Sequence, residues 1–140
     1  MRKKLYFMHP VNTYDTEFER ELLGAIRRYF NGWTVENPNQ NKHQEGYENF
    51  KKEIGDGMKY FTERVLPECG MGVYLSFRDG FIPAGVAKEA EYFLDRGRPL
   101  WEIIPGFDPI PRREIPADKV LSVQDTRARI RDGEGNTLPY

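Results

Sequence analysis

Short apolar runs alternate along the chain with amphipathic stretches. The runs at residues 5–8, 33–35, 71–77, 99–104 and 119–123 predict strands, and continuous apolar strands are typical of a parallel sheet that is buried on both faces. In three stretches between them, at about residues 16–29, 47–65 and 85–96, apolar residues recur at spacings of three and four, which predicts helices. This order predicts a flavodoxin-like, Rossmann-like three-layer α/β sandwich with a five-stranded, mainly parallel sheet in the order 2-1-3-4-5.

Local signals refine the expected elements. Thr16 and Glu19 form a capping box at the start of the first helix, and Asn31-Gly32 ends it. Gly55 and Gly57 each weaken the second helix by about 1 kcal/mol relative to Ala, so we expect a bend there. We expect an exposed polar loop at residues 39–46, an irregular proline-rich loop at residues 105–116, and one more short edge strand in the tail from residue 126.

Composition narrows the class of protein. The 140 residues suit a single domain, and 39% hydrophobic and 31% charged residues are typical of a folded globular chain. A formal net charge of −1 gives no basic excess, so we expect no nucleic-acid polymer as a partner. Cys69 is the only cysteine and the two histidines are far apart, so we expect neither a disulfide nor a metal site. The apolar runs are too short for a signal peptide or a membrane span, so we expect a cytoplasmic protein.

The topology predicts where a ligand binds. In open α/β sheets the site lies beyond the carboxyl ends of the strands where the strand order reverses, here between the first and third strands. Glu89 lies at the edge of the apolar face of the third helix and near its start; it is either a functional carboxylate or a boundary residue that favours the helix start. Tyr6, in the first strand, either reaches this cleft or is a buried tyrosine with a local hydrogen bond.

The loops at residues 9–15 and 78–85 supply the other candidates. Asp79 is either an acid that protonates a leaving group or a turn former, and His9 is a candidate for binding phosphate or a base edge. Small residues before the third helix would let backbone N–H groups approach an anion, although the spacing is not a Walker A motif and equally suits a plain turn. We assign no specific role to His43. The candidate substrate-binding residues here are His9, Pro10, Phe77, Gly80, Ala84 and Gly85.

A longer pattern links these residues. The segment 72–103 (GVYLSFRDGFIPAGVAKEAEYFLDRGRPLWEI) places Gly85, Glu89 and Gly97-Arg98-Pro99 in a fixed register. Over residues 4–104 the chain resembles the nucleoside 2-deoxyribosyltransferases and the related 2'-deoxynucleoside 5'-phosphate N-hydrolases. The resemblance implies that Glu89 attacks the anomeric carbon to form a covalent deoxyribosyl-enzyme and that Tyr6 orients this carboxylate.

The same resemblance implies the remaining parts of the site. Pro83 stands where family members often carry an acidic or polar residue, so Asp79 becomes the expected acid for the departing base. Neighbouring subunits complete the pocket in that family, which makes Asn136 and Tyr140 candidates for such a role. We therefore expect a homo-oligomer, an expectation that exposed aromatics would support; the candidates are Tyr47, Phe81 and Trp101.

Three functions stay open at this point. The first is cleavage or exchange of the N-glycosidic bond of a (deoxy)nucleoside or its 5'-monophosphate, without a cofactor. The second is a non-catalytic nucleotide-binding or sensor module on the same fold. The third is a hydrolase of another ligand, such as NAD or a nucleotide sugar, that uses the same glutamate; GxGxxG is absent after the first strand, which argues against an NAD-dependent dehydrogenase.

Overall fold

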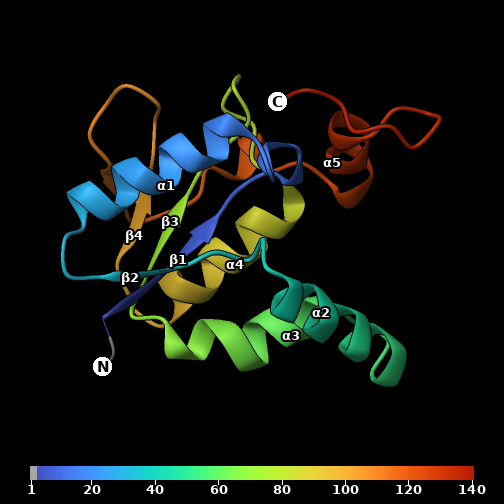
Figure 1. Ribbon diagram of the computed structural model, residues 1–140, viewed down its shortest axis with the longest axis horizontal. Coiled ribbons are helices and arrows are strands. Elements are labelled where there is room, and N and C mark those ends of the chain that lie inside the picture. The colour runs from blue at the N-terminus through green and yellow to red at the C-terminus, as the bar shows by residue number, and fades with distance from the viewer. Residues whose placement is uncertain (1–2) are drawn as a thin grey trace.

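The sheet has the predicted flavodoxin-like order. A computed structural model describes residues 3–140; residues 1 and 2 lie outside the described residues. Five strands follow one another across the sheet in the order β2-β1-β3-β4-β5 (Figure 1). Neighbouring strands are parallel except for the last pair, β4 and β5, which is antiparallel. The strands are β1 (Lys4–Met8), β2 (Thr34–Glu36), β3 (Met71–Tyr74), β4 (Leu100–Glu102) and β5 (Ile110–Arg112).

Helices cover both faces of the sheet. The apolar residues of α1 (Glu17–Tyr29) pack on one face and those of α4 (Ala84–Asp95) on the other. Beside α4 lies a helical hairpin made of α2 (Asn41–Glu53), the short α3 (Met58–Tyr60) and a π-helical turn, η2 (Phe61–Val65) (Figure 1). The last helix, α5 (Val123–Ile130), lies beyond the end of the sheet and contacts α4. The remaining short turns are η1 (Val11–Thr13), η3 (Leu66–Glu68) and η4 (Ala117–Lys119).

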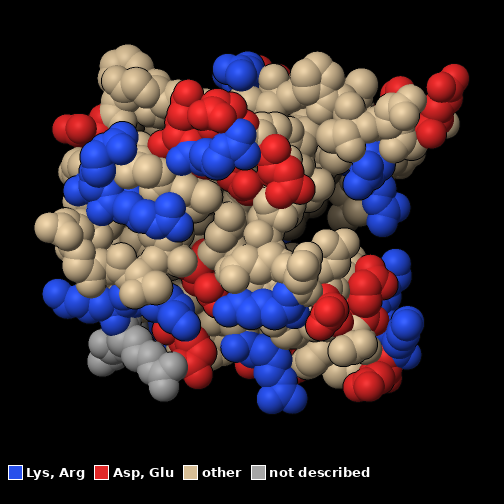
Figure 2. All heavy atoms as spheres, in the orientation of Figure 1, with Lys and Arg blue, Asp and Glu red and all other residues tan. Residues whose placement is uncertain are grey.

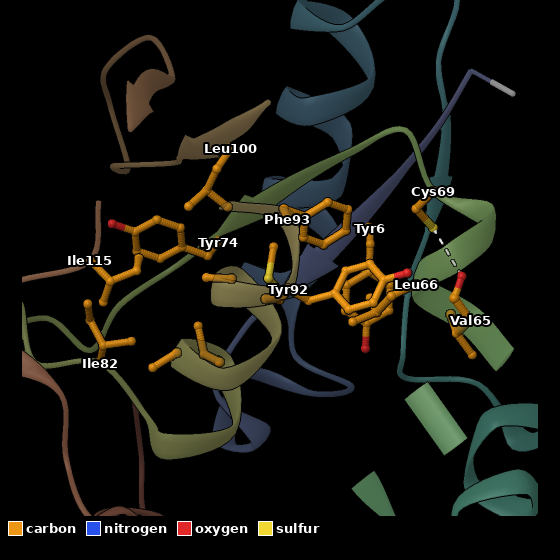
Figure 3. Close-up of a cluster of buried hydrophobic side chains, with 14 residues drawn as sticks. Tyr6, Val65, Leu66, Cys69, Tyr74, Ile82, Tyr92, Phe93, Leu100 and Ile115 are labelled. Carbon is orange, nitrogen blue, oxygen red and sulfur yellow. Dashed lines mark hydrogen bonds between the residues drawn. The ribbon is translucent and has the colours of Figure 1, made fainter. Parts of the chain in front are cut away.

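Strand alternation decides which side chains meet which helix. Leu5 and Phe7 of β1 point toward α1, so Tyr6 and Met8 point toward α4. Figure 3 shows the cluster on the α4 side, where Tyr6 lies among buried aromatic and aliphatic side chains. Gly72 of β3 leaves space for this packing, because a Cβ there would lie 2.6 Å from the Met8 side chain. Tyr6 is therefore held at a fully buried position in the centre of the sheet.

The second helical stretch differs in part from its prediction. The loop expected at residues 39–46 is wrong, because α2 begins at Asn41. A short turn precedes this helix, and in it Asn39 N–H donates to Asn37 Oδ1. The expected bend at Gly55 is confirmed as a break between α2 and α3, with Gly55 in the left-handed region at a φ of 86°. The hairpin turns there because glycine adopts this conformation at no steric cost.

The carboxyl-terminal third departs most from prediction. The fifth strand lies at Ile110–Arg112, inside the expected proline-rich loop, because Pro111 is tolerated on an edge strand that needs no further donor. The strand expected at residues 119–123 is wrong: only Val120 makes a bridge, to Ile82, and Ser122 caps α5 by accepting from Asp125 N–H. Likewise, the tail contains α5 and one bridge, Arg131 to Thr137, instead of an edge strand.

Over residues 3–140, no helix combines the length and the apolar character needed to cross a membrane. This finding is in line with the absence of long apolar runs noted in the sequence.

Candidate functional site

Tyr6 and Glu89 form a buried pair between the sheet and α4. Tyr6 Oη donates a hydrogen bond of 2.8 Å to Glu89 Oε2. Glu89 lies in the second turn of α4, next to the apolar face formed by Val86, Ala87 and Ala90. Only 7% of the surface of Glu89 is exposed. The interpretation of Glu89 as a carboxylate turned away from bulk water and toward β1 therefore agrees with the geometry.

Burial dominates the electrostatics of this pair. Loss of hydration raises the pKa of the Glu89 carboxyl to about 8, and the hydrogen bond from Tyr6 lowers it only in part. Burial and the nearby Glu89 charge raise the pKa of the Tyr6 phenol well above its ordinary value, so Tyr6 stays a donor. No ion pair within residues 3–140 involves Glu89. A titratable group perturbed in this way, beside one of the two strands at which the strand order reverses, is a candidate functional residue.

Tyr14 is a third member of the site that the sequence did not single out. It follows η1 in the loop after β1, and its ring lies 4.8 Å from the His9 ring. Burial, followed by the charges of Glu89 and Glu19, raises the pKa of Tyr14 above its ordinary value, which places its phenol within electrostatic reach of Glu89. The Tyr14 hydroxyl makes no hydrogen bond to the described residues. An aromatic residue in the loop where the strand order reverses was the available signal.

The surface is hollowed near the start of α4. Figure 2 shows the surface hollowed between the part of the molecule that carries α5 and the part formed by α2 and α3, where Figure 1 places the start of α4. Gly85, in the first turn of α4, faces this hairpin, because a Cβ there would lie 3.8 Å from Met58 Cε. The small residue keeps the approach to the start of α4 open.

Comparison with protein-family models, curated proteins and solved structures finds no match. The candidate function therefore rests on the geometry of this chain.

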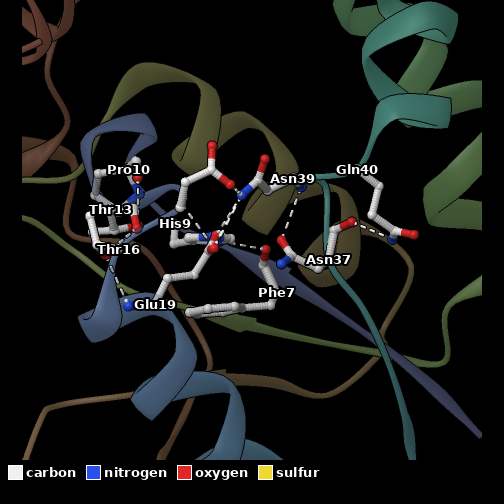
Figure 4. A network of polar contacts seen from close by, with 10 residues as sticks. Phe7, His9, Pro10, Thr13, Thr16, Glu19, Asn37, Asn39 and Gln40 are labelled. Carbon is white, nitrogen blue, oxygen red and sulfur yellow. Dashed lines mark hydrogen bonds and ion pairs between the residues drawn. The ribbon is translucent and has the colours of Figure 1, made fainter.

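His9 belongs to a polar network with Glu19 and Asn39 (Figure 4). Its ring stacks on Phe7 with 4.0 Å between centroids, and its nitrogens contact Phe7 O at 3.0 Å and Glu19 Oε2 at 2.7 Å. Both ring nitrogens are therefore engaged by partners within the protein. His9 thus has no free nitrogen for the phosphate or base edge that the sequence suggested, and it instead supports the loop that carries Tyr14.

Glu19 is the anion of this network, a role that the sequence did not reveal. Its backbone N–H donates to Thr16 Oγ1 at 3.1 Å, as the capping box predicts. Its carboxylate, however, accepts from His9, from Asp15 N–H at 3.1 Å and from the Asn39 amide at 3.1 Å. Burial raises the pKa of Glu19, but these hydrogen bonds outweigh it, so the pKa is lowered overall. The capping signal hid this second role.

The structure does not bring Asp79 to the Tyr6–Glu89 pair. Asp79 Oδ2 forms an ion pair of 2.8 Å with Arg129 Nη1. Slight burial raises the pKa of Asp79, but Arg129 and the Phe81 N–H outweigh it, and the pKa is lowered. A carboxylate of this kind holds no proton at neutral pH, which makes Asp79 unsuited to protonate a leaving base.

The remaining candidates have mainly local roles. The first N–H of α4, at Ala84, donates to Thr126 Oγ1 at 2.9 Å, so it is not free for an anion. Pro10 closes the η1 turn by accepting from Thr13, and Gly80 occupies a turn with a φ of 89°. The Asn136 amide donates to Asp132 in a turn of the tail. None of these residues contacts Glu89 through a hydrogen bond among the described residues.

His43, to which we assigned no specific role, is buried in α2. Its ring nitrogens contact Tyr60 Oη at 2.8 Å and Glu36 Oε1 at 3.1 Å, which ties the hairpin to β2. Burial lowers the pKa of His43 more than Glu36 raises it. His43 therefore has a structural role that we did not expect, because the segment that carries it is a helix and not a loop.

Two further expectations can be set against the structure. In the part of the chain that the structure describes, no group of three His, Cys, Asp or Glu side chains is arranged to hold a metal ion. The three aromatic residues that we expected to be exposed, Tyr47, Phe81 and Trp101, are instead half-buried. Each contacts another side chain: Tyr47 lies near the Phe61 ring, Phe81 near the Lys119 ammonium group and Trp101 near the Phe30 ring. The large apolar side chain that is most exposed is Phe107, at 75%.

Proposed function

We propose that this protein cleaves or exchanges the N-glycosidic bond of a (deoxy)nucleoside or of its 5'-monophosphate, with Glu89 as the nucleophile. The observation that carries the proposal is the buried hydrogen bond of 2.8 Å from Tyr6 to Glu89, between α4 and β1, which is one of the two strands at which the strand order reverses. The resemblance to the deoxyribosyltransferases, which rests on the register of Glu89 with Gly85 and Gly97, adds support to the assignment.

The chemistry is a double displacement. A carboxylate oxygen of Glu89 attacks C1' of the sugar, the C1'–N bond breaks, and its electron pair leaves with the base, which takes up a proton. Water, or the nitrogen of a second base, then attacks C1' and releases Glu89 as a carboxylate, while the proton of the attacking group passes to solvent. Dividing one displacement into two lowers each barrier, as in retaining glycosidases.

Tyr6 positions the nucleophile. Its hydroxyl occupies Glu89 Oε2, which leaves Oε1 as the oxygen directed to the sugar. The donor also stabilises the ionised form of a carboxyl group whose pKa burial raises to about 8. A poorly hydrated carboxylate is a stronger nucleophile than one in bulk water, so the same burial that delays ionisation favours attack.

Tyr14 is the donor that we assign to the leaving base. Its hydroxyl is unpartnered among the described residues and lies within electrostatic reach of Glu89. A hydrogen bond from this hydroxyl would stabilise the charge that develops on the base nitrogen. Tyr14 thereby takes the place that the sequence gave to Asp79, which Arg129 holds elsewhere.

The decisive experiment replaces Glu89. We expect Glu89→Gln and Glu89→Ala to abolish base release from deoxynucleosides and their 5'-monophosphates, followed by chromatography with and without a second base as acceptor. Glu91→Gln is the matched control, because Glu91 lies on the exposed face of the same helix. Intact-mass measurement of the wild type with substrate should show the added deoxyribosyl group. Turnover by Glu89→Gln at the wild-type rate would exclude Glu89 as the nucleophile.

A second candidate is a non-catalytic nucleotide-binding module. Two observations favour it. Asp79 is engaged in an ion pair with Arg129, and Pro83 stands where a related enzyme would often carry an acidic or polar residue, so no second carboxylic acid contacts Glu89 among the described residues. Thermal shift separates the two functions. Stabilisation of the wild type by nucleotides without any product, even at pH values above 8, would support binding alone.

A further inference from the structure

A pocket lies between the loop after β3, α5 and the tail. Its volume is about 560 Å³, which is in the range of sites for small organic ligands. Neither Tyr6 nor Glu89 lines it. The residues that line the pocket are Asn12, Phe77, Arg78, Asp79, Arg129, Leu138, Pro139 and Tyr140.

Two guanidinium groups are held in place at this pocket. The Arg129 guanidinium lies over the rings of Phe77 and Phe81, at 5.3 and 5.2 Å, and pairs with Asp79 through Nη1. The Arg78 guanidinium lies 4.7 Å from the centre of the Tyr140 ring, and its Nε donates to the Tyr140 carbonyl oxygen at 3.0 Å. These contacts fix the planes of both groups, and stacked arginines of this kind are pre-organised for anions.

Most of the donor capacity of the two arginines is unused. Each guanidinium carries five N–H bonds, and the hydrogen bonds and ion pairs given above engage one nitrogen of each. The other side-chain nitrogens have no hydrogen-bond partner among the described residues. Arg78 and Arg129 thus bring two guanidinium groups to the lining, and Asp79 forms an ion pair with one of them.

Asn12, which also lines this pocket, has an acceptor atom without a hydrogen-bond partner among the described residues. The residue is 7% exposed, its Nδ2 donates to Arg129 O at 3.4 Å, and its buried Oδ1 has no partner among the described residues. A buried carbonyl oxygen without a donor is costly, and such an atom calls for a partner. A ligand that brings an O–H or N–H group to this wall would supply it.

We propose that this pocket binds a phosphate monoester whose organic part carries a hydroxyl or N–H donor. A phosphate dianion matches two adjacent guanidinium forks better than a single carboxylate does, and the volume leaves space for a sugar or nucleoside. The donor of the organic part is the partner that Asn12 Oδ1 lacks. This inference stands independently of the proposed glycosidic chemistry. The phosphate belongs either to the substrate itself or to a separate small molecule.

Calorimetric titration with inorganic phosphate, ribose 5-phosphate, dAMP and deoxyadenosine tests the pocket. We expect dAMP to bind the wild type at least ten-fold more tightly than deoxyadenosine does, with an affinity that falls as salt rises. Arg78→Gln and Arg129→Gln should each weaken dAMP and ribose 5-phosphate about ten-fold or more, and Arg129→Lys should lose less. Arg127→Gln, an exposed residue of the same helix, is the matched control and should change nothing.

Two results would overturn the proposal. One is equal affinity for dAMP and deoxyadenosine, and the other is equal weakening by Arg127→Gln and Arg129→Gln. If saturating ribose 5-phosphate excludes deoxyadenosine, the pocket holds the phosphate of the substrate; if both bind together, it holds a separate molecule. Glu89→Gln should retain phosphate binding. Loss of the glycosidic activity and loss of this site are therefore distinguishable.

Discussion

At the scale of single residues, the proposed chemistry depends on a carboxyl group placed where water hardly reaches. Glu89 accepts a hydrogen bond from the Tyr6 hydroxyl. It forms no ion pair within the described residues. Its pKa of about 8 is therefore set by two opposing contributions, burial and the Tyr6 donor. A change in either one is expected to move the pH at which the carboxylate becomes available.

Removal of the Tyr6 hydroxyl tests this balance. In Tyr6→Phe the pKa of Glu89 should rise above about 8, because burial then acts without the opposing donor. We expect kcat/KM for base release to fall by about ten- to a hundred-fold at pH 7 and its rising limb to shift to higher pH. The measurement is a pH profile of kcat/KM for both proteins.

Tyr74→Phe is the control for that variant. Tyr74 is a fully buried tyrosine on the same face of the neighbouring strand, and its hydroxyl donates to Glu102 at 3.3 Å instead of Glu89. Its pH profile should keep the wild-type midpoint. A midpoint that is unchanged in Tyr6→Phe would mean that this hydroxyl does not tune Glu89.

The sequence predicted the central pair but not its surroundings. The helical wheel placed Glu89 at the edge of the apolar face of its helix, and the family resemblance implied that Tyr6 orients its carboxylate. The roles of Tyr14, Glu19 and His43 were not predicted. Tyr14 and His43 act through residues of other segments, and the capping signal of Glu19 hid its contact with His9. Asp79 carried a plausible local signal, but its partner Arg129 is 50 positions away (129 − 79).

At the scale of elements, the hairpin of α2 and α3 is held by close contacts at glycine. A Cβ on Gly46 would lie 2.1 Å from the Tyr60 ring, and one on Gly57 would lie 2.5 Å from the Tyr47 ring. Tyr60 in turn contacts His43 at 2.8 Å. These contacts explain why a stretch with a weak helical pattern still adopts one arrangement beside α4.

Gly46→Ala should therefore destabilise the protein by about 1–3 kcal/mol, because the added methyl group forces the Tyr60 ring to move. Urea unfolding at fixed pH measures the difference. Gly133→Ala is the control, since a Cβ there meets nothing within 4 Å. Equal unfolding midpoints for the wild type and Gly46→Ala would show that the hairpin accommodates the ring without cost.

Prediction of the elements failed where long-range pairing overrides local pattern. The apolar residues around Val120 favour a strand, yet the sheet is completed by Ile110–Arg112, which pairs with β4 in the antiparallel direction. Ser122, which was expected in the strand at residues 119–123, instead caps the start of α5 by accepting from Asp125 N–H. The strand order was predictable because right-handed crossovers leave few alternatives, but the identity of an edge strand is decided by its partner.

At the scale of the whole molecule, the buried carboxyl group links stability to pH. Glu89 has an ordinary pKa of 4.5 and a pKa of about 8 in the folded protein, so the folded state binds its proton more tightly than the unfolded state. Between these two values the unfolded chain holds fewer protons at this position, and stability falls as pH rises. Glu19 and His43, whose pKa values are lowered, act in the opposite direction in their own ranges.

A difference measurement isolates the contribution of Glu89. In Glu89→Gln the amide resembles the protonated acid in shape and still accepts from Tyr6, so the variant should match the wild type near pH 5 and be more stable at pH 8. The gap should open across the window from about 4.5 to about 8 and reach a few kcal/mol. Urea unfolding at half-unit pH steps measures it, with Glu91→Gln as the exposed control on the same helix. A gap that is constant with pH would mean that Glu89 is ionised throughout, and the burial that underlies its proposed reactivity would then have to be abandoned.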